Sequence, residues 1–139
     1  MKKKTVILAG LILILMVSCE PNDWNLILDG VDDVKNLSVT HPSSENAEFS
    51  YTIPGYPICE LRDDECGYNI YFYYSPANAD TKTYVRAEYY QNPTEGDTDI
   101  VTVDMTSYSL TGGSQYTFTV YTIDENHKPS NGVSQTITW

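Results

Sequence analysis

Few residues of this chain have the surroundings that catalysis requires. His41 and His127 are its only histidines, and each lies among turn-forming residues, His41 beside Pro42 and His127 beside Lys128. Enzymes need a nucleophile with a base, or paired carboxylates at a cleft. The nineteen acidic residues are spread along the chain, so no pair stands out. We predict that the protein is not an enzyme and holds no cofactor and no metal.

The tyrosines have more potential as binding residues. The chain has twelve of them, more than the core of a domain this size uses. Those expected to point away from the core are Tyr71, Tyr73, Tyr89 and Tyr121. Tyrosine offers a large, rigid surface that is both apolar and hydrogen-bonding, which suits a sugar ring or a protein partner. The alternative is that exposed tyrosines reflect only a preference for strands.

β-Strands must position these tyrosines, because apolar and polar residues alternate between clusters of proline, glycine and asparagine. We expect strands at Val34–Thr40, Ala47–Ile53, Tyr68–Tyr74, Thr83–Tyr90, Asp99–Asp104, within Leu110–Asp124 and at Gly132–Trp139. The first strand should stop at His41 and Pro42. Seven or eight short strands without a helical pattern predict an all-β, antiparallel sandwich.

The alternation is strictest in Leu110–Asp124. It places Tyr116, Phe118 and Val120 in the core and Tyr121 on the opposite face. This stretch therefore determines which face of its sheet is buried.

Two other strands are less regular. The strand Thr83–Tyr90 mixes charged and aromatic residues, which predicts a partly exposed edge. One face of it carries Tyr84, Arg86, Glu88 and Tyr90. In Asp99–Asp104, Ile100 is expected to be buried, with Val101 and Val103 as further candidates.

Residues 1–18 have the anatomy of a cleaved signal peptide. Three lysines precede the apolar run Thr5–Val17, which is too short to span a bilayer comfortably. The junction Leu15-Met16-Val17-Ser18-Cys19 resembles a bacterial lipobox, although Met16 stands where leucine is usual. The resemblance implies cleavage before Cys19 and acylation of Cys19, which would make the membrane a partner. The alternative is an ordinary secretory signal.

The resemblance also implies a domain organisation. Residues 19–30 would be the lipidated cysteine and a tether, and residues 31–139 the sandwich. Trp24–Leu28, inside the tether, could add an edge strand or cover one end of the sandwich. Glu20 and Asp23 resemble the acidic export signals of surface lipoproteins in the Bacteroidota. We expect the protein in a bacterial cell envelope, lipid-anchored, in the outer membrane.

The mature chain would be strongly acidic. Removing the leader removes three of the eight basic residues and none of the acidic ones, so the net charge becomes −14. Such a surface disfavours nucleic acid as a partner.

Two cysteines remain if Cys19 carries lipid. Cys59 and Cys66 are separated by six residues, in a chain exported to an oxidising space. A zinc site would want more thiols or imidazoles, so we predict a disulfide between them. The acids of this loop, within Glu60–Glu65, could attract calcium, but we favour a solvated turn.

The mature chain resembles a fibronectin type III domain over residues 31–139. Leu110, Tyr116, Phe118 and Val120 look like the tyrosine corner of that family, in which the tyrosine hydroxyl bonds back across the loop. Tyr51 stands where the family commonly has tryptophan. The resemblance implies an immunoglobulin-like β-sandwich of about seven strands.

This fold hosts many unrelated functions. We expect a non-catalytic binding or accessory module of the envelope that meets a glycan or a protein. The alternative is a structural assembly subunit that pairs with another envelope protein.

Overall fold

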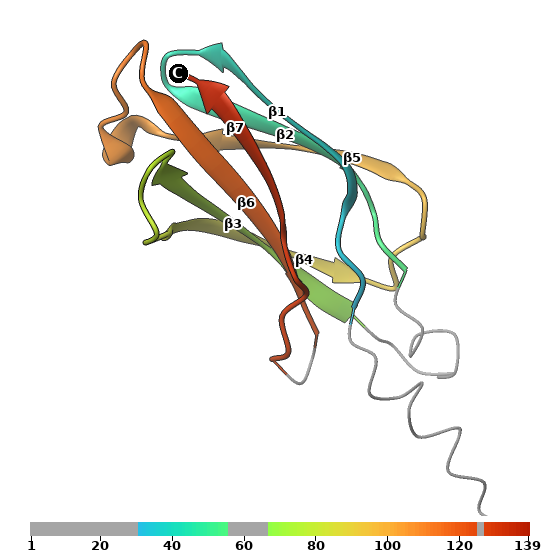
Figure 1. Ribbon diagram of the computed structural model, residues 1–139. Helices are drawn as coiled ribbons and strands as arrows, with labels where there is room; N and C mark the ends of the chain where they lie inside the picture. Colours follow the sequence, from blue (N-terminus) through green and yellow to red (C-terminus); the bar gives the residue numbers. More distant parts are fainter. Residues whose placement is uncertain (1–30, 56–66, 125–126) are drawn as a thin grey trace, which may run out of the picture.

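Two antiparallel sheets face each other in the computed structural model, which describes residues 31–55, 67–124 and 127–139 (Figure 1). The first sheet has the order β1-β2-β5, formed by Lys35–Ser43, Asn46–Thr52 and Thr98–Asp104. The second has the order β4-β3-β6-β7, formed by Thr83–Gln91, Gly67–Pro76, Gln115–Ile123 and Val133–Thr138. A single 3-10 turn, η1 (Thr106–Tyr108), precedes β6 among these residues. The predicted all-β sandwich of about seven strands is confirmed.

Several predictions concern residues outside this described part. These are the lipidation at Cys19, the tether with Trp24–Leu28, and the loop with Cys59, Cys66 and its acidic residues. They stay predictions. Within the described ranges, no helix is both long and apolar enough to cross a bilayer.

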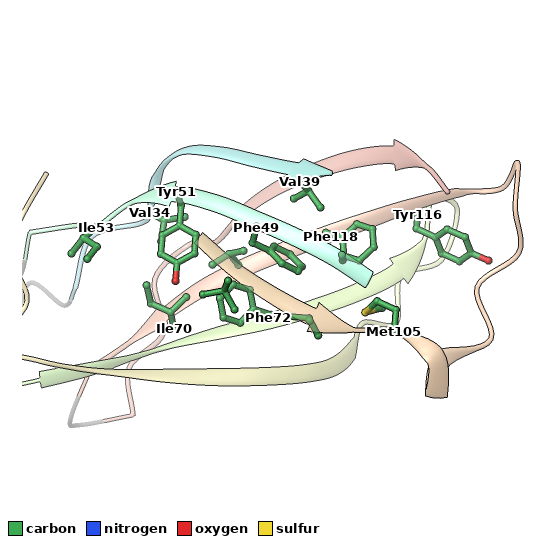
Figure 2. Close-up of a cluster of buried hydrophobic side chains, with 14 of the residues drawn as sticks. Val34, Val39, Phe49, Tyr51, Ile53, Ile70, Phe72, Met105, Tyr116 and Phe118 are labelled. Atoms are coloured by element: carbon green, nitrogen blue, oxygen red, sulfur yellow. The ribbon is translucent and has the colours of Figure 1, made fainter. Parts of the chain in front are cut away.

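The core lies between the sheets because alternate side chains of each strand point inward (Figure 2). Phe49, Tyr51 and Phe72 have no exposed surface, and neither does Phe118. The rings of Phe49 and Phe72 meet edge to face at 4.8 Å, and those of Phe49 and Phe118 at 5.6 Å. Tyr51 therefore occupies a central core position, where the family commonly has tryptophan.

The tyrosine corner is present. The hydroxyl of Tyr116 accepts a hydrogen bond of 3.0 Å from the backbone N–H of Thr111, across the loop before β6. Tyr116 and Val120 are buried with Phe118, whereas Tyr121 is partly exposed on the other face. The predicted faces of this strand are confirmed.

Strand β1 extends further than predicted. It continues through His41 and Pro42 to Ser43. Proline lacks the N–H that a central strand would need. However, β1 is an edge strand, and its pairing with β2 shifts register between Thr40 and Ser43. Pro42 therefore lies within β1 without removing a hydrogen bond between β1 and β2.

The prediction for Ile100 was wrong. This side chain is 59% exposed, while Val101 and Val103 are buried. In β5 these two valines pair with Phe49 and Ala47, which are inward-facing, so Ile100 lies on the outer face of its sheet. The misassignment arose because Ile100 and Val101 are adjacent apolar residues, and such a pair does not show which of the two points inward.

Polar bridges join the sheets at both open edges. At one edge, the backbone N–H of Val39 in β1 donates to Oε1 of Gln135 in β7 at 2.7 Å. At the other, Tyr90 of β4 donates a short hydrogen bond to Asp99 of β5, and its hydroxyl lies 2.5 Å from that of Tyr51. Burial is the main cause that raises the pKa values of Tyr51 and Tyr90 above the ordinary value.

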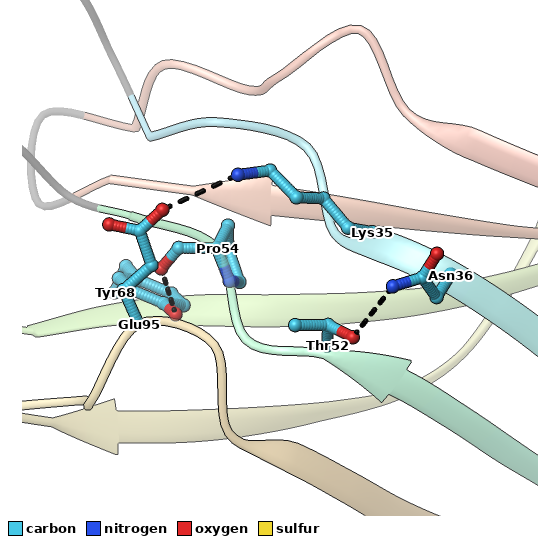
Figure 3. A network of polar contacts seen from close by, with 6 residues as sticks. All are labelled: Lys35, Asn36, Thr52, Pro54, Tyr68 and Glu95. Carbon is cyan, nitrogen blue, oxygen red and sulfur yellow. Dashed lines mark hydrogen bonds and ion pairs between the residues drawn. The ribbon is translucent and has the colours of Figure 1, made fainter.

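Further polar contacts hold the end of the sandwich where β1 begins (Figure 3). The buried hydroxyl of Tyr68 donates to the carbonyl of Pro54 at 3.2 Å, and burial raises the pKa of Tyr68. Lys35 forms an ion pair with Glu95 at 3.3 Å, but both side chains are more than half exposed. An exposed pair of this kind adds about 0–1 kcal/mol at most.

Candidate functional site

Four tyrosines form a continuous strip on the outer face of the four-stranded sheet. They are Tyr71 and Tyr73 of β3, Tyr84 of β4 and Tyr121 of β6, and we call them the tyrosine strip. The ring centres of Tyr71 and Tyr84 are 5.9 Å apart, those of Tyr84 and Tyr73 are 5.7 Å apart, and those of Tyr73 and Tyr121 are 5.6 Å apart. Aromatic pairs at these distances attract one another beyond their buried area. The strip is therefore a single cluster that crosses three neighbouring strands.

A β-bulge brings Tyr84 into this cluster. Phe72 pairs with Arg86, but the next residue, Tyr73, pairs with Tyr84, so Val85 is the extra residue of β4. The bulge shifts the alternation of β4 by one position. Arg86 consequently points between the sheets while Tyr84 points outward. The prediction that these two residues share a face was wrong for this reason.

Tyr89, the fourth tyrosine named from the sequence, lies on the same outer face but apart from the strip. It pairs with Asn69 and is 63% exposed. A Cβ atom at Gly67 would lie 2.4 Å from its hydroxyl oxygen, so the Tyr89 ring leans over Gly67. The structure thus gathers Tyr71, Tyr73 and Tyr121 with Tyr84, and places Tyr89 at the margin.

Tyr121 is fixed from two sides. A Cβ atom at Gly132 would lie 2.4 Å from the Tyr121 ring, so the ring rests directly on the backbone just before β7. Gly132 also has φ +85°, a conformation that residues with side chains rarely adopt. On the other side, Nζ of Lys82 donates to the Tyr121 hydroxyl at 2.6 Å and lies 4.9 Å from the ring centre. Lys82 therefore places one positive charge at the end of the strip.

The phenols of the strip are neutral hydrogen-bonding groups. Burial, followed by the nearness of Tyr71, Tyr84 and Tyr121, raises the pKa of Tyr73 above its ordinary value. Each phenol can donate one hydrogen bond and accept another. The strip thus combines ring surface with uncharged polar groups, a combination suited to binding rather than to proton transfer.

The histidines are not part of this site. His41 lies in β1, where its ring is 5.1 Å from that of Trp139. His127 has φ 65° and lies in the loop before β7. Within residues 31–55, 67–124 and 127–139, no three histidines, cysteines or acids are grouped so as to hold a metal ion.

Sequence reasoning missed two residues of the site. Tyr84 was assigned to the other face, and Lys82 precedes the predicted strand. No glycine marks the bulge at Val85, so nothing in the alternation signals that the phase changes there. Lys82 meets Tyr121 only through the folding of β3 and β6 against each other.

No protein-family model and no curated protein matches this sequence. Among solved structures, the fold is similar to a fibronectin type III domain from the human KIAA0970 protein, with a TM-score of 0.56 and 11% identity over 87% of this chain and 84% of that one. Titin domains A168–A170 give a TM-score of 0.51 at 18% identity, covering 79% of this chain and 32% of that one. The twitchin kinase region of C. elegans gives 0.52 at 12%, covering 79% and 17%.

These identities show the fold alone. The chain spans 28% of the spore cortex lytic enzyme SleM of Clostridium perfringens and 17% of the twitchin region, so it corresponds to one domain of such larger proteins. The predicted fibronectin type III-like β-sandwich is confirmed. A fold of this kind hosts many unrelated functions, so the chemistry of this chain must be argued from its site.

Proposed function

We propose that the protein is a non-catalytic binding module of a bacterial cell envelope, held by lipid on Cys19, which binds a glycan or protein ligand through the tyrosine strip. The observation that carries the proposal is the strip itself: four tyrosines in contact on an outer sheet face. Rigid aromatic side chains give much contact area at low entropic cost, which is why they dominate binding surfaces. The lipobox resemblance supports the envelope location.

Photocrosslinking tests whether the strip is a binding face. The full-length protein in its host cells would carry p-benzoylphenylalanine in place of Tyr84. A matched control would carry it in place of Ile100, which is exposed to a similar degree, 59% against 49%, on the opposite sheet. We expect a crosslinked product from position 84 and none from position 100. Equal products, or none at position 84, would contradict the proposal.

The crosslinked product also identifies the kind of ligand. A heterogeneous smear that glycosidases remove indicates a glycan, and a discrete band that proteases remove indicates a protein. A product from position 100 alone would instead support an assembly subunit that contacts its partner through the other sheet.

The lipid anchor predicts a clear effect of Cys19→Ala. The wild-type protein should incorporate labelled palmitate and sediment with membranes, because acyl chains contribute about 0.8 kcal/mol per buried CH₂. The variant should lose both properties while remaining exported. Cys59→Ala is the matched control and should keep the label. Labelling of the Cys19→Ala variant would contradict the anchor.

A further inference from the structure

No charged side chain points outward from the strands of the four-stranded sheet, although the chain as a whole is strongly acidic. Every outward-facing position of β3, β4, β6 and β7 is tyrosine, threonine, serine, asparagine, glutamine, alanine, isoleucine or glycine. The opposite sheet differs, because Glu48 and Asp104 lie on its outer face. Glu88 of β4 points inward, where Arg86 pairs with it. The outer face of the four-stranded sheet is therefore less negative than the outer face of the opposite sheet.

Rows of hydroxyl groups border the strip. The hydroxyls of Thr119 and Ser134 are 2.8 Å apart, and those of Thr117 and Thr136 are also 2.8 Å apart. Thr119 is the ladder neighbour of Tyr73 but is itself buried. The hydroxyls of these pairs that a ligand could reach are therefore those of Thr117, Ser134 and Thr136. A hydroxyl in such a pair keeps a lone pair for a further hydrogen bond. The face thus offers rings beside neutral donors and acceptors.

This composition matches one class of ligand better than others. A protein interface of standard size buries about 800 Å² on each partner, and its core is enriched in aromatic residues, methionine and arginine. The outward positions of these strands supply only Ala87 and Ile123 as aliphatic side chains beside the tyrosines. Uncharged sugars present apolar C–H surfaces and hydroxyl groups together, which complement rings and hydroxyl rows.

The net charge of the chain favours uncharged sugars over acidic ones as ligands. The chain has a net charge of −11, or −14 without residues 1–18, and therefore repels polyanions. Among the residues that the structure describes, Lys82 is the cation in contact with the strip, and its ammonium already donates to Tyr121. We infer that the tyrosine strip and its hydroxyl border bind an uncharged polysaccharide. This inference rests on the proposed binding function of the strip and adds the class of ligand.

The test is affinity electrophoresis of the full-length protein in detergent with soluble polysaccharides. Laminarin, galactomannan, xyloglucan and starch represent uncharged chains, and polygalacturonate and chondroitin sulfate represent acidic ones. We expect retardation by at least one uncharged polysaccharide and by neither acidic one. The apparent dissociation constant should stay nearly constant between about 50 and 500 mM NaCl, because no ion pair is screened.

Variants assign the binding to the strip. Tyr84→Ala should weaken binding by about tenfold or more, a loss of about 1.4 kcal/mol. The melting temperature should fall only slightly, because Tyr84 is half exposed and loses two ring contacts. Ile100→Ala should bind as the wild type does.

Each contrary result has a distinct meaning. Retardation by the acidic polysaccharides alone would overturn the inference that the ligand is uncharged. Retardation by none of the six polysaccharides would overturn a glycan ligand. In both cases a crosslink specific to position 84 would leave the proposed binding function standing. Absence of that crosslink would overturn the binding function itself.

Discussion

Replacing Phe118 with alanine is expected to lower the free energy of unfolding by about 3–5 kcal/mol, the usual cost of truncating a buried phenylalanine. The Phe118 side chain is fully buried and meets rings from both sheets, with centroid distances of 5.6 Å to Phe49, 6.4 Å to Tyr74 and 6.2 Å to Trp139. The substitution would leave a cavity, and this cavity cannot collapse easily because the rings around it are held in place by the rest of the core.

The size of this effect matters because a whole domain is stable by only about 5–15 kcal/mol. The melting temperature should fall by about 12 °C or more. Thr117→Ala is the matched control, since Thr117 is the preceding residue and faces outward, where its hydroxyl pairs with Thr136. It should cost less than about 1 kcal/mol. Equal losses in urea denaturation of both variants would show that the faces of β6 are misassigned.

Alkaline conditions should destabilise the protein steeply. Burial raises the pKa values of Tyr51 and Tyr68 above the ordinary value of about 10, so both keep their protons in the folded state after the unfolded chain has lost them. The folded state then binds more protons than the unfolded state, and stability falls as pH rises. Below pH about 10 both states are protonated, and this contribution is fully present.

Above pH about 10, each of these two tyrosines should lower the free energy of unfolding by about 1.4 kcal/mol per pH unit, or about 3 kcal/mol together. Tyr90 adds to the slope, because burial and its hydrogen bonds with Asp99 and Tyr51 raise its pKa as well. Urea denaturation at several pH values from 8 to about 11 measures the slope.

The matched variant for this prediction is Tyr51→Phe, which keeps the ring and removes the ionisable hydroxyl. Its slope above pH about 10 should be smaller by about one proton. The variant should also be less stable at neutral pH, because Tyr90 loses a hydrogen-bond neighbour at 2.5 Å. A free energy of unfolding that stays constant up to pH about 11 would show that burial does not raise the pKa values of these phenols.

Strands such as β6 could be predicted from the sequence because apolar and polar residues alternate along them without interruption. In β6, Tyr116, Phe118 and Val120 repeat at every second position, and only one register buries all of them. The corner hydrogen bond between Tyr116 and Thr111 followed from a resemblance rather than from the pattern. The faces of β6 and the corner hydrogen bond both depend on residues that are close together in the sequence, so both could be predicted from it.

The errors arose where the partner strand decides the outcome. Ile100 is outward because its neighbours in β5 pair with the buried residues of β2. Pro42 continues β1 because that strand has only one neighbour. Tyr84 joins the strip because Val85 is an extra residue opposite β3. The alternation of residues within one strand does not determine how that strand pairs with its neighbour. These positions therefore could not be predicted from a single strand.

The bulge at Val85 has a second consequence, for the self-association of the protein. Strand β4 is the edge of its sheet, and an unpaired edge is a template on which another strand can add. Here the edge is bent by the bulge, and it carries Arg86 and Glu88 pointing inward as a charged pair. A second chain could not pair along β4 without straightening the bulge and disturbing those charges. Edge-to-edge pairing of two copies through β4 is therefore disfavoured, and the tyrosines beside this edge stay accessible.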